Sequence, residues 1–216
     1  MKFVVTAGPT REHLDPVRFL SNPSTGKMGF AVARAAATRG HEAVLVAGPV
    51  SLKTPKGVRR IDVTSAREML AAVEQEMAKA RSGTPAVLVA AAAVADWRPA
   101  KCSARKLKKG QMSDTLRLVR NPDILKTVAR RRGKGLIAIG FAAETNDVVA
   151  EARRKCREKN LDMVVANDVT EKGAGFGAST NRVTFVRRDG SAERLPLMTK
   201  LAVARRIVRE CEDLRP

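Results

Sequence analysis

A long segment before the first predicted helix collects the small polar and cationic residues that bind anions. Ser24, Thr25 and Gly26 stand immediately before that helix, and Lys27 is the next residue. Hydroxyl groups and free backbone N–H groups at a helix N-terminus attract anions, and an adjacent lysine adds positive charge. We therefore interpret this segment as an anion-binding site in preference to an ordinary connecting loop.

Two common phosphate-binding patterns are absent from the same segment. A Walker A loop needs a glycine five positions before Gly26, where Ser21 stands, and a hydroxyl residue where Met28 stands. The dinucleotide pattern G-x-G-x-x-G is missing because only Gly8 and then Pro9 follow the first predicted strand. These absences disfavour a dinucleotide-dependent oxidoreductase, which we keep as a less favoured hypothesis.

Residues without bulk end two further predicted strands. Ala90–Ala93 would let a flat ligand approach the backbone closely, although a tight helix–sheet contact is an equally good explanation, and the small residues Gly140, Ala142 and Ala143 repeat the pattern at a second strand end. Asp96 follows the first of these runs and could bind a ribose hydroxyl, bind a metal-held phosphate or cap a helix. Phe141 is the one aromatic residue placed to touch a base.

Cations gather in the segment Lys101–Lys109, which we interpret as a lid that closes over phosphates. Further along, Asn121 precedes Pro122, and this pair predicts an N-cap followed by the first helical residue. The glycine-rich stretch 172–177 is either a second flap or a flexible surface loop.

Elements that alternate along the chain must position these residues. Short apolar strands are predicted at Lys2–Thr6, Glu42–Ala47, Arg59–Val63, Ala86–Ala91, Leu136–Phe141 and Asp162–Ala166. Helices are predicted at about Gly26–Arg39, Ala66–Ala80, Pro122–Arg132, Val148–Lys159 and Thr199–Glu212.

This alternation predicts an α/β fold in a single domain spanning residues 1–216: a three-layer α/β/α, Rossmann-like arrangement with a mostly parallel central sheet. Alternating residues at Arg182–Arg188, followed by Asp189 and Gly190, predict a C-terminal antiparallel strand pair that ends near Leu195. Ligands of such folds bind at the carboxyl ends of the strands, where the polar segments lie.

Composition narrows the possible partners. The formal net charge of +19 predicts a polyanion, such as a nucleic acid, a nucleotide, a phosphorylated metabolite or an anionic membrane face. Aromatic residues make up only 3% of the chain, so a base-stacking nucleic-acid binder is disfavoured. The longest apolar run, Ala86–Ala95, is too short to span a membrane. A basic nucleic-acid-binding protein stays the main alternative.

Three cysteines and two histidines argue against both a disulfide framework and a zinc site. The N-terminus carries no apolar signal-peptide region. We therefore expect a protein of the reduced cytoplasm.

Several short motifs follow one another in an order that is more specific than any of them alone. They are Ala7–Glu12, Asp15–Phe19, Ser21–Gly29, Ala92–Asp96, Lys106–Lys109, Asn121–Ile124, Gly140–Thr145 and Ala166–Asp168. Together, from about Lys2 to Glu212, they closely resemble phosphopantothenate–cysteine ligase (phosphopantothenoylcysteine synthetase) of the bacterial CTP-dependent type, here as a stand-alone synthetase domain.

The resemblance implies a ligase of coenzyme A biosynthesis that joins 4′-phosphopantothenate to L-cysteine through an acyl-cytidylate, and releases CMP and pyrophosphate. Magnesium would accompany CTP. Because the chain starts at the first strand, we expect no preceding flavin-dependent decarboxylase and no flavin. The family is commonly a homodimer with substrate sites near the interface, and we expect neither nucleic acid nor membrane as a partner.

The resemblance also implies roles for individual residues. Asn22, Arg18 and Lys106 would act in catalysis. The substrate or intermediate would lie against Ala92, Ala93, Ser24, Thr25, Gly26 and Lys27. CTP would contact Ala90, Ala91, Ala92, Asp96, Lys106, Pro122, Asp123, Ile124, Leu125, Phe141, Lys155 and Lys159.

Overall fold

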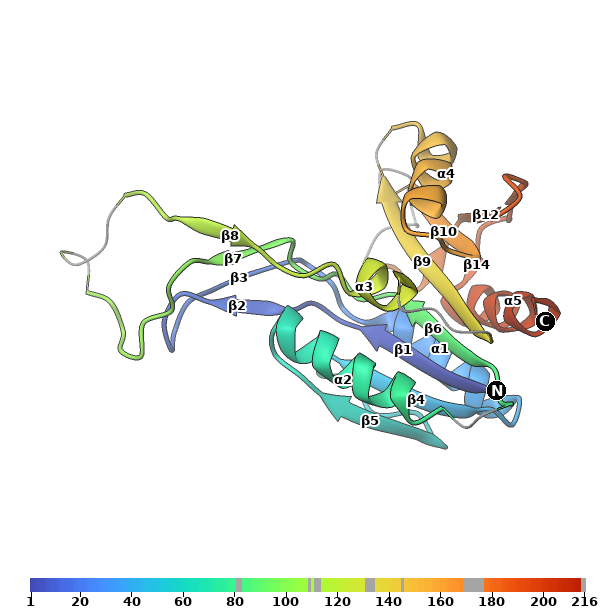
Figure 1. Cartoon of the computed structure of the whole chain (residues 1–216), viewed down its shortest axis with the longest axis horizontal. Helices are drawn as coiled ribbons and strands as arrows, with labels where there is room; N and C mark the ends of the chain where they lie inside the picture. Colours follow the sequence, from blue (N-terminus) through green and yellow to red (C-terminus); the bar gives the residue numbers. More distant parts are fainter. Residues whose placement is uncertain are drawn as a thin grey trace.

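An eight-stranded sheet runs through the molecule in the order β13-β12-β10-β9-β6-β1-β4-β5 (Figure 1). The computed structural model describes residues 1–80, 83–108, 110, 114–130, 135–144, 146–168 and 177–214. The strands are β1 (Lys2–Ala7), β4 (Glu42–Ala47), β5 (Val58–Asp62), β6 (Ala86–Ala90), β9 (Leu136–Glu144), β10 (Met163–Asp168), β12 (Val183–Arg187) and β13 (Ala192–Arg194).

Pairing within the sheet confirms the predicted topology. The strands from β5 to β10 pair in parallel. The strands β12 and β13 pair antiparallel and extend the sheet beyond β10, as the Asp189-Gly190 turn predicts. Buried residues alternate between the two faces: Phe3 and Val5 of β1 belong to one core, whereas Val4 belongs to the other.

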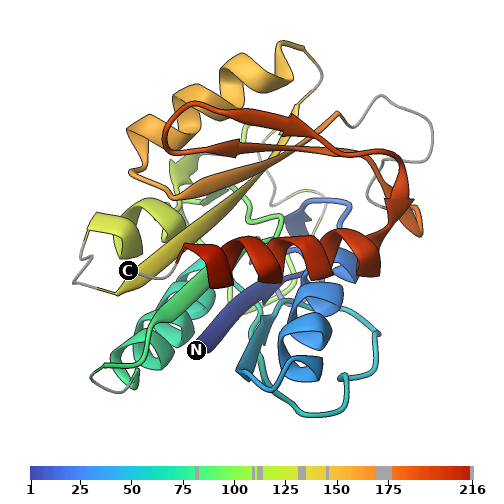
Figure 2. The same ribbon diagram turned by 90° about the vertical axis from the view of Figure 1, so that its right-hand side faces the viewer.

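Helices cover both faces of the sheet and complete the predicted three layers. The helices α1 (Lys27–Thr38) and α5 (Lys200–Asp213) pack beside each other on one face (Figure 2). The helices α2 (Ala66–Ala78), α3 (Ile124–Arg130) and α4 (Val148–Glu158) cover the other. In the part of the chain that is described, no helix has the length and apolar character needed to cross a membrane.

Four short strands form an arm that projects from the sheet (Figure 1). β2 (Arg11–His13) pairs with β3 (Phe19–Ser21), and β7 (Trp97–Pro99) pairs with β8 (Leu118–Arg120). We call residues 11–21 and the described residues of 97–120 the arm. These strands were not predicted, because three residues are too few to show a period of two. The predicted Gly-rich flap at 172–177 lies outside the described residues, except Gly177.

A second small ladder connects the end of the sheet to α5. β11 (Thr180–Asn181) pairs antiparallel with β14 (Met198–Thr199), so that the chain enters α5 beside β11. Thr199 is the N-cap of α5, and its hydroxyl accepts a hydrogen bond from the backbone N–H of Ala202. The first residue of α5, Lys200, is held beside this ladder, because its backbone N–H donates to the carbonyl oxygen of Ser179 at 3.0 Å.

A buried carboxylate joins α2 to the first strand. Glu76, with 1% of its surface exposed, accepts hydrogen bonds from Lys2 at 3.2 Å, from Lys79 at 2.8 Å and from Arg59. Burial raises the pKa of Glu76, but the bonds from Lys79, Arg59 and Lys2 outweigh it and lower the pKa to about 2. The carboxylate therefore stays charged in the folded protein at neutral pH.

Candidate functional site

A cavity of about 480 Å³ opens at the carboxyl ends of β1, β6 and β9. The chain leaves β1 toward β4 and leaves β6 toward β9, which lie on opposite sides, so this is the point where the strand order reverses. Nearly every residue to which the resemblance assigned a role lines it: Asn22, Ser24, Thr25, Gly26, Lys27, Ala90, Ala91, Ala92, Ala93, Asp96, Pro122, Asp123, Ile124, Leu125, Phe141, Lys155 and Lys159.

The run of alanines after β6 is held by two buried threonine hydroxyls. The backbone N–H of Ala92 donates to Thr6 Oγ1 at 3.2 Å, and that of Ala95 donates to Thr10 Oγ1 at 3.0 Å. These bonds fix the backbone of a segment in which every side chain from Ala90 to Ala95, except that of Val94, is a methyl group. The cavity therefore has a fixed wall that a flat ligand can approach closely.

Two glycines let the loop after β1 pass close to its neighbours. Gly8, with a φ of +77°, accepts a hydrogen bond from Ala93 N through its carbonyl oxygen at 2.9 Å. A Cβ atom on Gly48 would lie 1.7 Å from the carbonyl oxygen of Pro9. Glycine at position 48 is therefore a steric requirement for the path of this loop.

Asn22 connects the loop after β1 to the alanine segment. Its Nδ2 atom donates to the carbonyl oxygens of Ala93 and Val94, both at 3.2 Å. The amide N–H2 group is thus already engaged with the protein, which leaves Oδ1 as the atom for a ligand. The predicted role of Asn22 in holding an intermediate is compatible with this placement.

The N-terminus of α1 lies in the cavity wall. Its N-cap is Gly26, which has a φ of +77° and no side chain that could accept from the first-turn N–H groups. Lys27 is the first residue of the helix, and its Nζ donates to the carbonyl oxygen of Gly177 at 2.8 Å. This arrangement has the features of the anion site that the sequence predicts.

The turn before α3 differs from the prediction in its cap. The helix begins at Ile124, and Asp123 caps it by accepting from Lys126 N through Oδ1 at 2.9 Å. Asn121, predicted as the N-cap, instead donates from Nδ2 to the carbonyl oxygen of Ala95 at 2.8 Å. The prediction was wrong because the first helical residue is Ile124 and not Pro122.

Two lysines of the α4 segment reach the same cavity. Lys155 Nζ donates to the carbonyl oxygen of Phe141 at 2.6 Å, and Lys159 Nζ lies 2.6 Å from Asp123 Oδ2. Burial raises the pKa of Asp123, but Lys159 and the backbone N–H of Lys126 outweigh it, so the pKa is lowered. Both lysine side chains are therefore anchored by protein oxygens at the cavity wall.

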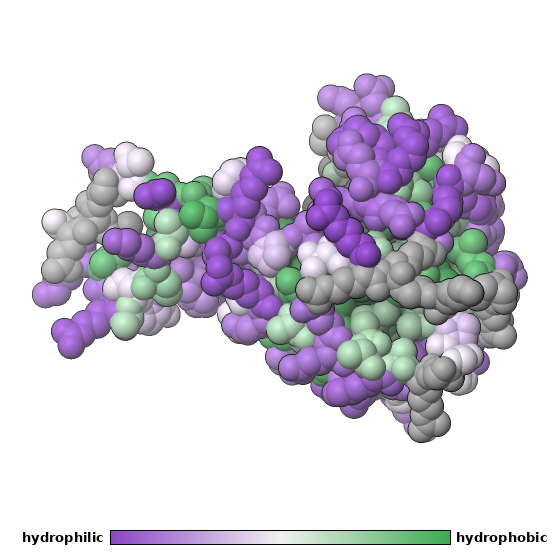
Figure 3. Space-filling view, viewed as in Figure 1, coloured by the Kyte–Doolittle hydropathy of each residue, from purple (hydrophilic) through white to green (hydrophobic). Residues whose placement is uncertain are grey.

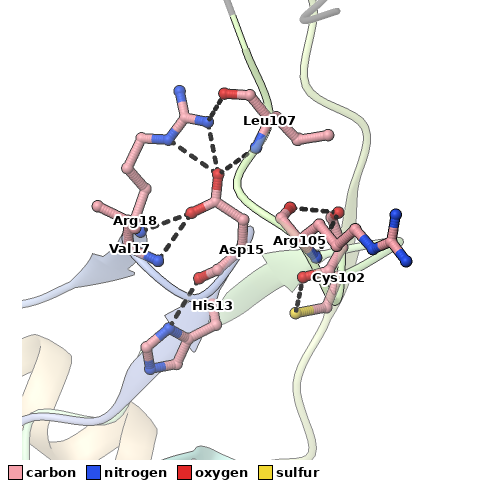
Figure 4. A network of polar contacts seen from close by, with 8 residues as sticks. His13, Asp15, Val17, Arg18, Cys102, Arg105 and Leu107 are labelled. Carbon is pink, nitrogen blue, oxygen red and sulfur yellow. Dashed lines mark hydrogen bonds and ion pairs between the residues drawn. The ribbon is translucent and has the colours of Figure 1, made fainter.

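Arg18 and Lys106 lie together on the arm, and neither lines the cavity of its own chain. Figure 4 shows the network that fastens this part of the arm. Arg18 donates from Nε to Asp15 Oδ2 at 3.1 Å and from Nη2 to the carbonyl oxygen of Leu107 at 2.9 Å. Leu107 N donates in turn to Asp15 at 3.2 Å. The basic segment that we predicted as a lid thus belongs to the projecting arm.

Three polar residues of the cavity were given no role by the sequence analysis, although one of them, Asn167, belongs to the motif Ala166–Asp168. Asn167 lies on β10, Asn181 lies on β11, and Lys200 is the first residue of α5. One signal was available for Lys200, because a lysine at the first position of a helix opposes the helix dipole. Nothing in the sequence indicates that β11 brings Asn181 to the cavity.

Comparisons with known proteins agree with this geometry. Residues 1–214 match the family model described as "DNA/pantothenate metabolism flavoprotein C-terminal domain". The chain is 48% identical over 205 residues to the coenzyme A biosynthesis bifunctional protein CoaBC of Vibrio cholerae, covering 94% of this chain and 50% of that protein. It is also 48% identical to the protein of the same name from Bacillus subtilis, covering 98% and 51%.

A solved structure is similar over nearly the whole chain. The crystal structure of the C-terminal domain of coenzyme A biosynthesis bifunctional protein CoaBC has a TM-score of 0.82 and 41% sequence identity, and the match covers 99% of this chain and 94% of that one. The present chain spans about half the length of the curated relatives that it matches.

Proposed function

The chain belongs to the family of DNA/pantothenate metabolism flavoprotein C-terminal domains, and from that premise we propose that it is a phosphopantothenate–cysteine ligase. The observation that carries this proposal is one cavity that is lined by three features together. They are the N-terminus of α1, which has no side-chain cap, the alanines at the end of β6, and the turn before α3. The names of the relatives, which refer to coenzyme A biosynthesis, support it. We propose that it acts in the cytoplasm.

The proposed reaction has two steps. A carboxylate oxygen of 4′-phosphopantothenate attacks the α-phosphorus of CTP, and the bond to the β-phosphate oxygen breaks, which gives an acyl-cytidylate and pyrophosphate. The neutral amine of L-cysteine then attacks the acyl carbon. The bond between that carbon and the phosphate oxygen breaks, CMP leaves, and the amine loses a proton to solvent as the amide forms.

Phosphoryl-type transfer needs positioned cations and dipoles more than covalent help from the protein. The turn from Pro122 to Leu125 would read the cytosine through its backbone. Lys155 and Lys159, which are already anchored at the cavity wall, would hold the triphosphate. Ala92 and Ala93 would lie along the acyl-cytidylate, next to Asn22.

The residues of the cavity fit a magnesium ion that is carried by the nucleotide. Among the described residues, no group of three or more histidine, cysteine or acidic residues could bind a metal without a substrate. Mg²⁺ is commonly held by one or two carboxylates together with substrate phosphates. Asp123 is paired with Lys159, so Asp96 is the carboxylate that we assign to the ion. Magnesium would neutralise phosphate charge during attack.

Arg18 and Lys106 enter the proposal through a homodimer. Among the described residues, nearly all exposed large apolar side chains lie on the arm: Val17, Phe19, Trp97, Leu116 and Leu118 (Figure 3). An apolar surface of this kind favours association. We propose that the arm packs on a second copy and carries Arg18 and Lys106 to the cavity of that copy.

The first experiment measures pyrophosphate release with 4′-phosphopantothenate, L-cysteine and magnesium, comparing CTP with ATP. We expect release with CTP and a need for L-cysteine to sustain it. The variant Asn22→Asp should lose amide formation, because it places a negative charge beside a phosphate, whereas the exposed control Lys56→Met should keep it. Folded protein that releases no pyrophosphate with either nucleotide would overturn the proposed activity and favour a test of nucleic-acid binding.

Mixing two inactive variants tests the role of the arm. Lys106→Gln removes the positive charge that the arm is proposed to supply, and Lys159→Met removes a positive charge from the cavity wall. If arms serve the opposite cavity, a mixed dimer holds one intact site, and co-expression should restore about a quarter of wild-type activity, since about half of the dimers are mixed. If each arm serves its own cavity, no mixed dimer has an intact site and activity stays absent, which would contradict the proposed dimer.

A further inference from the structure

One end of the cavity is formed by residues to which neither the motifs nor the family resemblance assigned a role. Lys200, the first residue of α5, and Asn181, on β11, both line the cavity. Both are buried, with 7% and 4% of their surfaces exposed. Lys27, the first residue of α1, lines the same cavity.

The two helices begin in a way that opposes their dipoles. Neither α1 nor α5 has an acidic residue in its first turn, and each starts with a lysine. Acidic residues stabilise a helix N-terminus, whereas a cation there is unfavourable. Two positive helix ends and two ammonium groups therefore face one cavity, a combination that an anion would stabilise.

The surroundings of Lys200 and Asn181 provide independent observations. Burial, and then the nearby charge of Lys27, lower the pKa of Lys200. The Oδ1 atom of Asn181 is buried and has no hydrogen-bond partner among the described residues. A buried amide oxygen without a hydrogen bond is costly, and rotation of this amide would present its N–H2 group to an anion in the place of that oxygen.

We propose that Lys200 and Asn181 bind a phosphate group of a substrate and thereby determine the preference for that phosphorylated substrate. The identity of the substrates rests on the proposed function, but the anion chemistry of the site does not. The phosphate could belong to 4′-phosphopantothenate or to the outer phosphates of CTP. The residues proposed to bind the nucleotide lie elsewhere, with Asp123 at the cap of α3, Phe141 on β9 and Lys155 on α4, which favours 4′-phosphopantothenate.

The first test needs no ligase activity. Thermal unfolding is followed with inorganic phosphate or pyrophosphate, against sodium chloride of equal ionic strength. At an anion concentration of about ten times its Kd, the wild-type melting temperature should rise by about 3 °C. Lys200→Met should lose most of this rise, and Lys56→Met should keep it. The melting temperature of each protein without anion is the reference from which its own rise is measured, so that any change in basal stability in Lys200→Met is kept apart from the loss of anion binding. Asn181→Asp, which places a carboxylate at the site, is the second variant.

Steady-state kinetics then identifies the source of the phosphate. If it belongs to 4′-phosphopantothenate, Lys200→Met should raise the KM for this substrate by about tenfold to hundredfold, with kcat and the KM for CTP changed much less. The preference over unphosphorylated pantothenate should fall in parallel, and Lys200→Arg should recover part of it. If the phosphate belongs to CTP, the KM for CTP should rise instead.

Each outcome decides one of the two proposals. Equal anion responses in wild type and Lys200→Met, together with unchanged KM values for both substrates, would overturn the phosphate site. A response that is lost in Lys200→Met, in a protein that makes no amide, would support the site and reject the ligase.

Discussion

Replacing Glu76 with glutamine should destabilise the protein at neutral pH by roughly 3 kcal/mol. The folded-state pKa of about 2, compared with 4.5 for an ordinary glutamate, corresponds by linkage to that amount. The loss of a buried ion-pair partner gives a similar estimate of about 3 to 5 kcal/mol, because Lys2 is only 4% exposed and would lose its buried carboxylate partner. The two estimates are not additive, since both describe the same contact.

The pH dependence of this loss follows from the direction of the shift. Because the pKa of Glu76 is lower in the folded state, its contribution is complete above about pH 5 and disappears as the pH falls toward 2. Urea unfolding of wild type and Glu76→Gln, followed by circular dichroism at several pH values between 3 and 7, measures the difference directly. Other carboxylates titrate in both proteins and cancel from that difference.

A matched control is available at the other carboxylate that pairs with Lys2. Glu42 lies 3.5 Å from Lys2 Nζ but is 60% exposed, so Glu42→Gln should cost less than about 1 kcal/mol at any pH. A Glu76→Gln deficit that stays constant between pH 5 and pH 3, or one no larger than that of Glu42→Gln, would refute the reasoning.

Two further predictions concern the loops around the cavity and the arm. Gly48→Ala should lower both the melting temperature and the rate of pyrophosphate release, because its Cβ would meet the Pro9 carbonyl oxygen. Gly110→Ala, with open space around it, should change neither. An unchanged melting temperature in Gly48→Ala would contradict the close approach. Asp15→Asn should speed tryptic cleavage of the arm. Its carboxylate is held charged by Arg18, which lowers its pKa well below the usual range; wild-type cleavage rates in Asp15→Asn would show that this network does not hold the arm.

The sheet and its helices were predictable because their patterns are long enough to read. The apolar run of β1 and the stripe of Met69 and Val73 on α2 continue over one or more periods, and the structure places them in the cores. The strands of the arm could not be found in this way. They are three residues long and partly exposed, and the pairing of β7 with β8 joins segments that are separated by the whole stretch 100–117.

The candidate site was predictable where it depends on the carboxyl ends of parallel strands. Asn22 lies in the segment between β1 and α1, Ala92 follows β6, and Phe141 lies on β9. The carboxyl ends of these parallel strands meet at one edge of the sheet, and this brings the three residues to the same cavity. The position of Lys106 depends on how the arm projects, and that of Asn181 on a two-residue strand. Neither property leaves a period or a motif, so only the structure shows where these two residues lie.

Charge at the two borders of the sheet limits how copies of this chain can associate. The edge strands are β5 and β13, and within the described residues each of them pairs on one side only. β5 carries Arg59, Arg60 and Asp62, and β13 carries Glu193 and Arg194. The unpaired backbone groups of an edge strand can pair with strands of other molecules, and short or charged edge strands prevent this pairing. A sheet that is apolar on both faces thus ends in borders that resist growth into fibrils, which should keep the protein dispersed at high concentration.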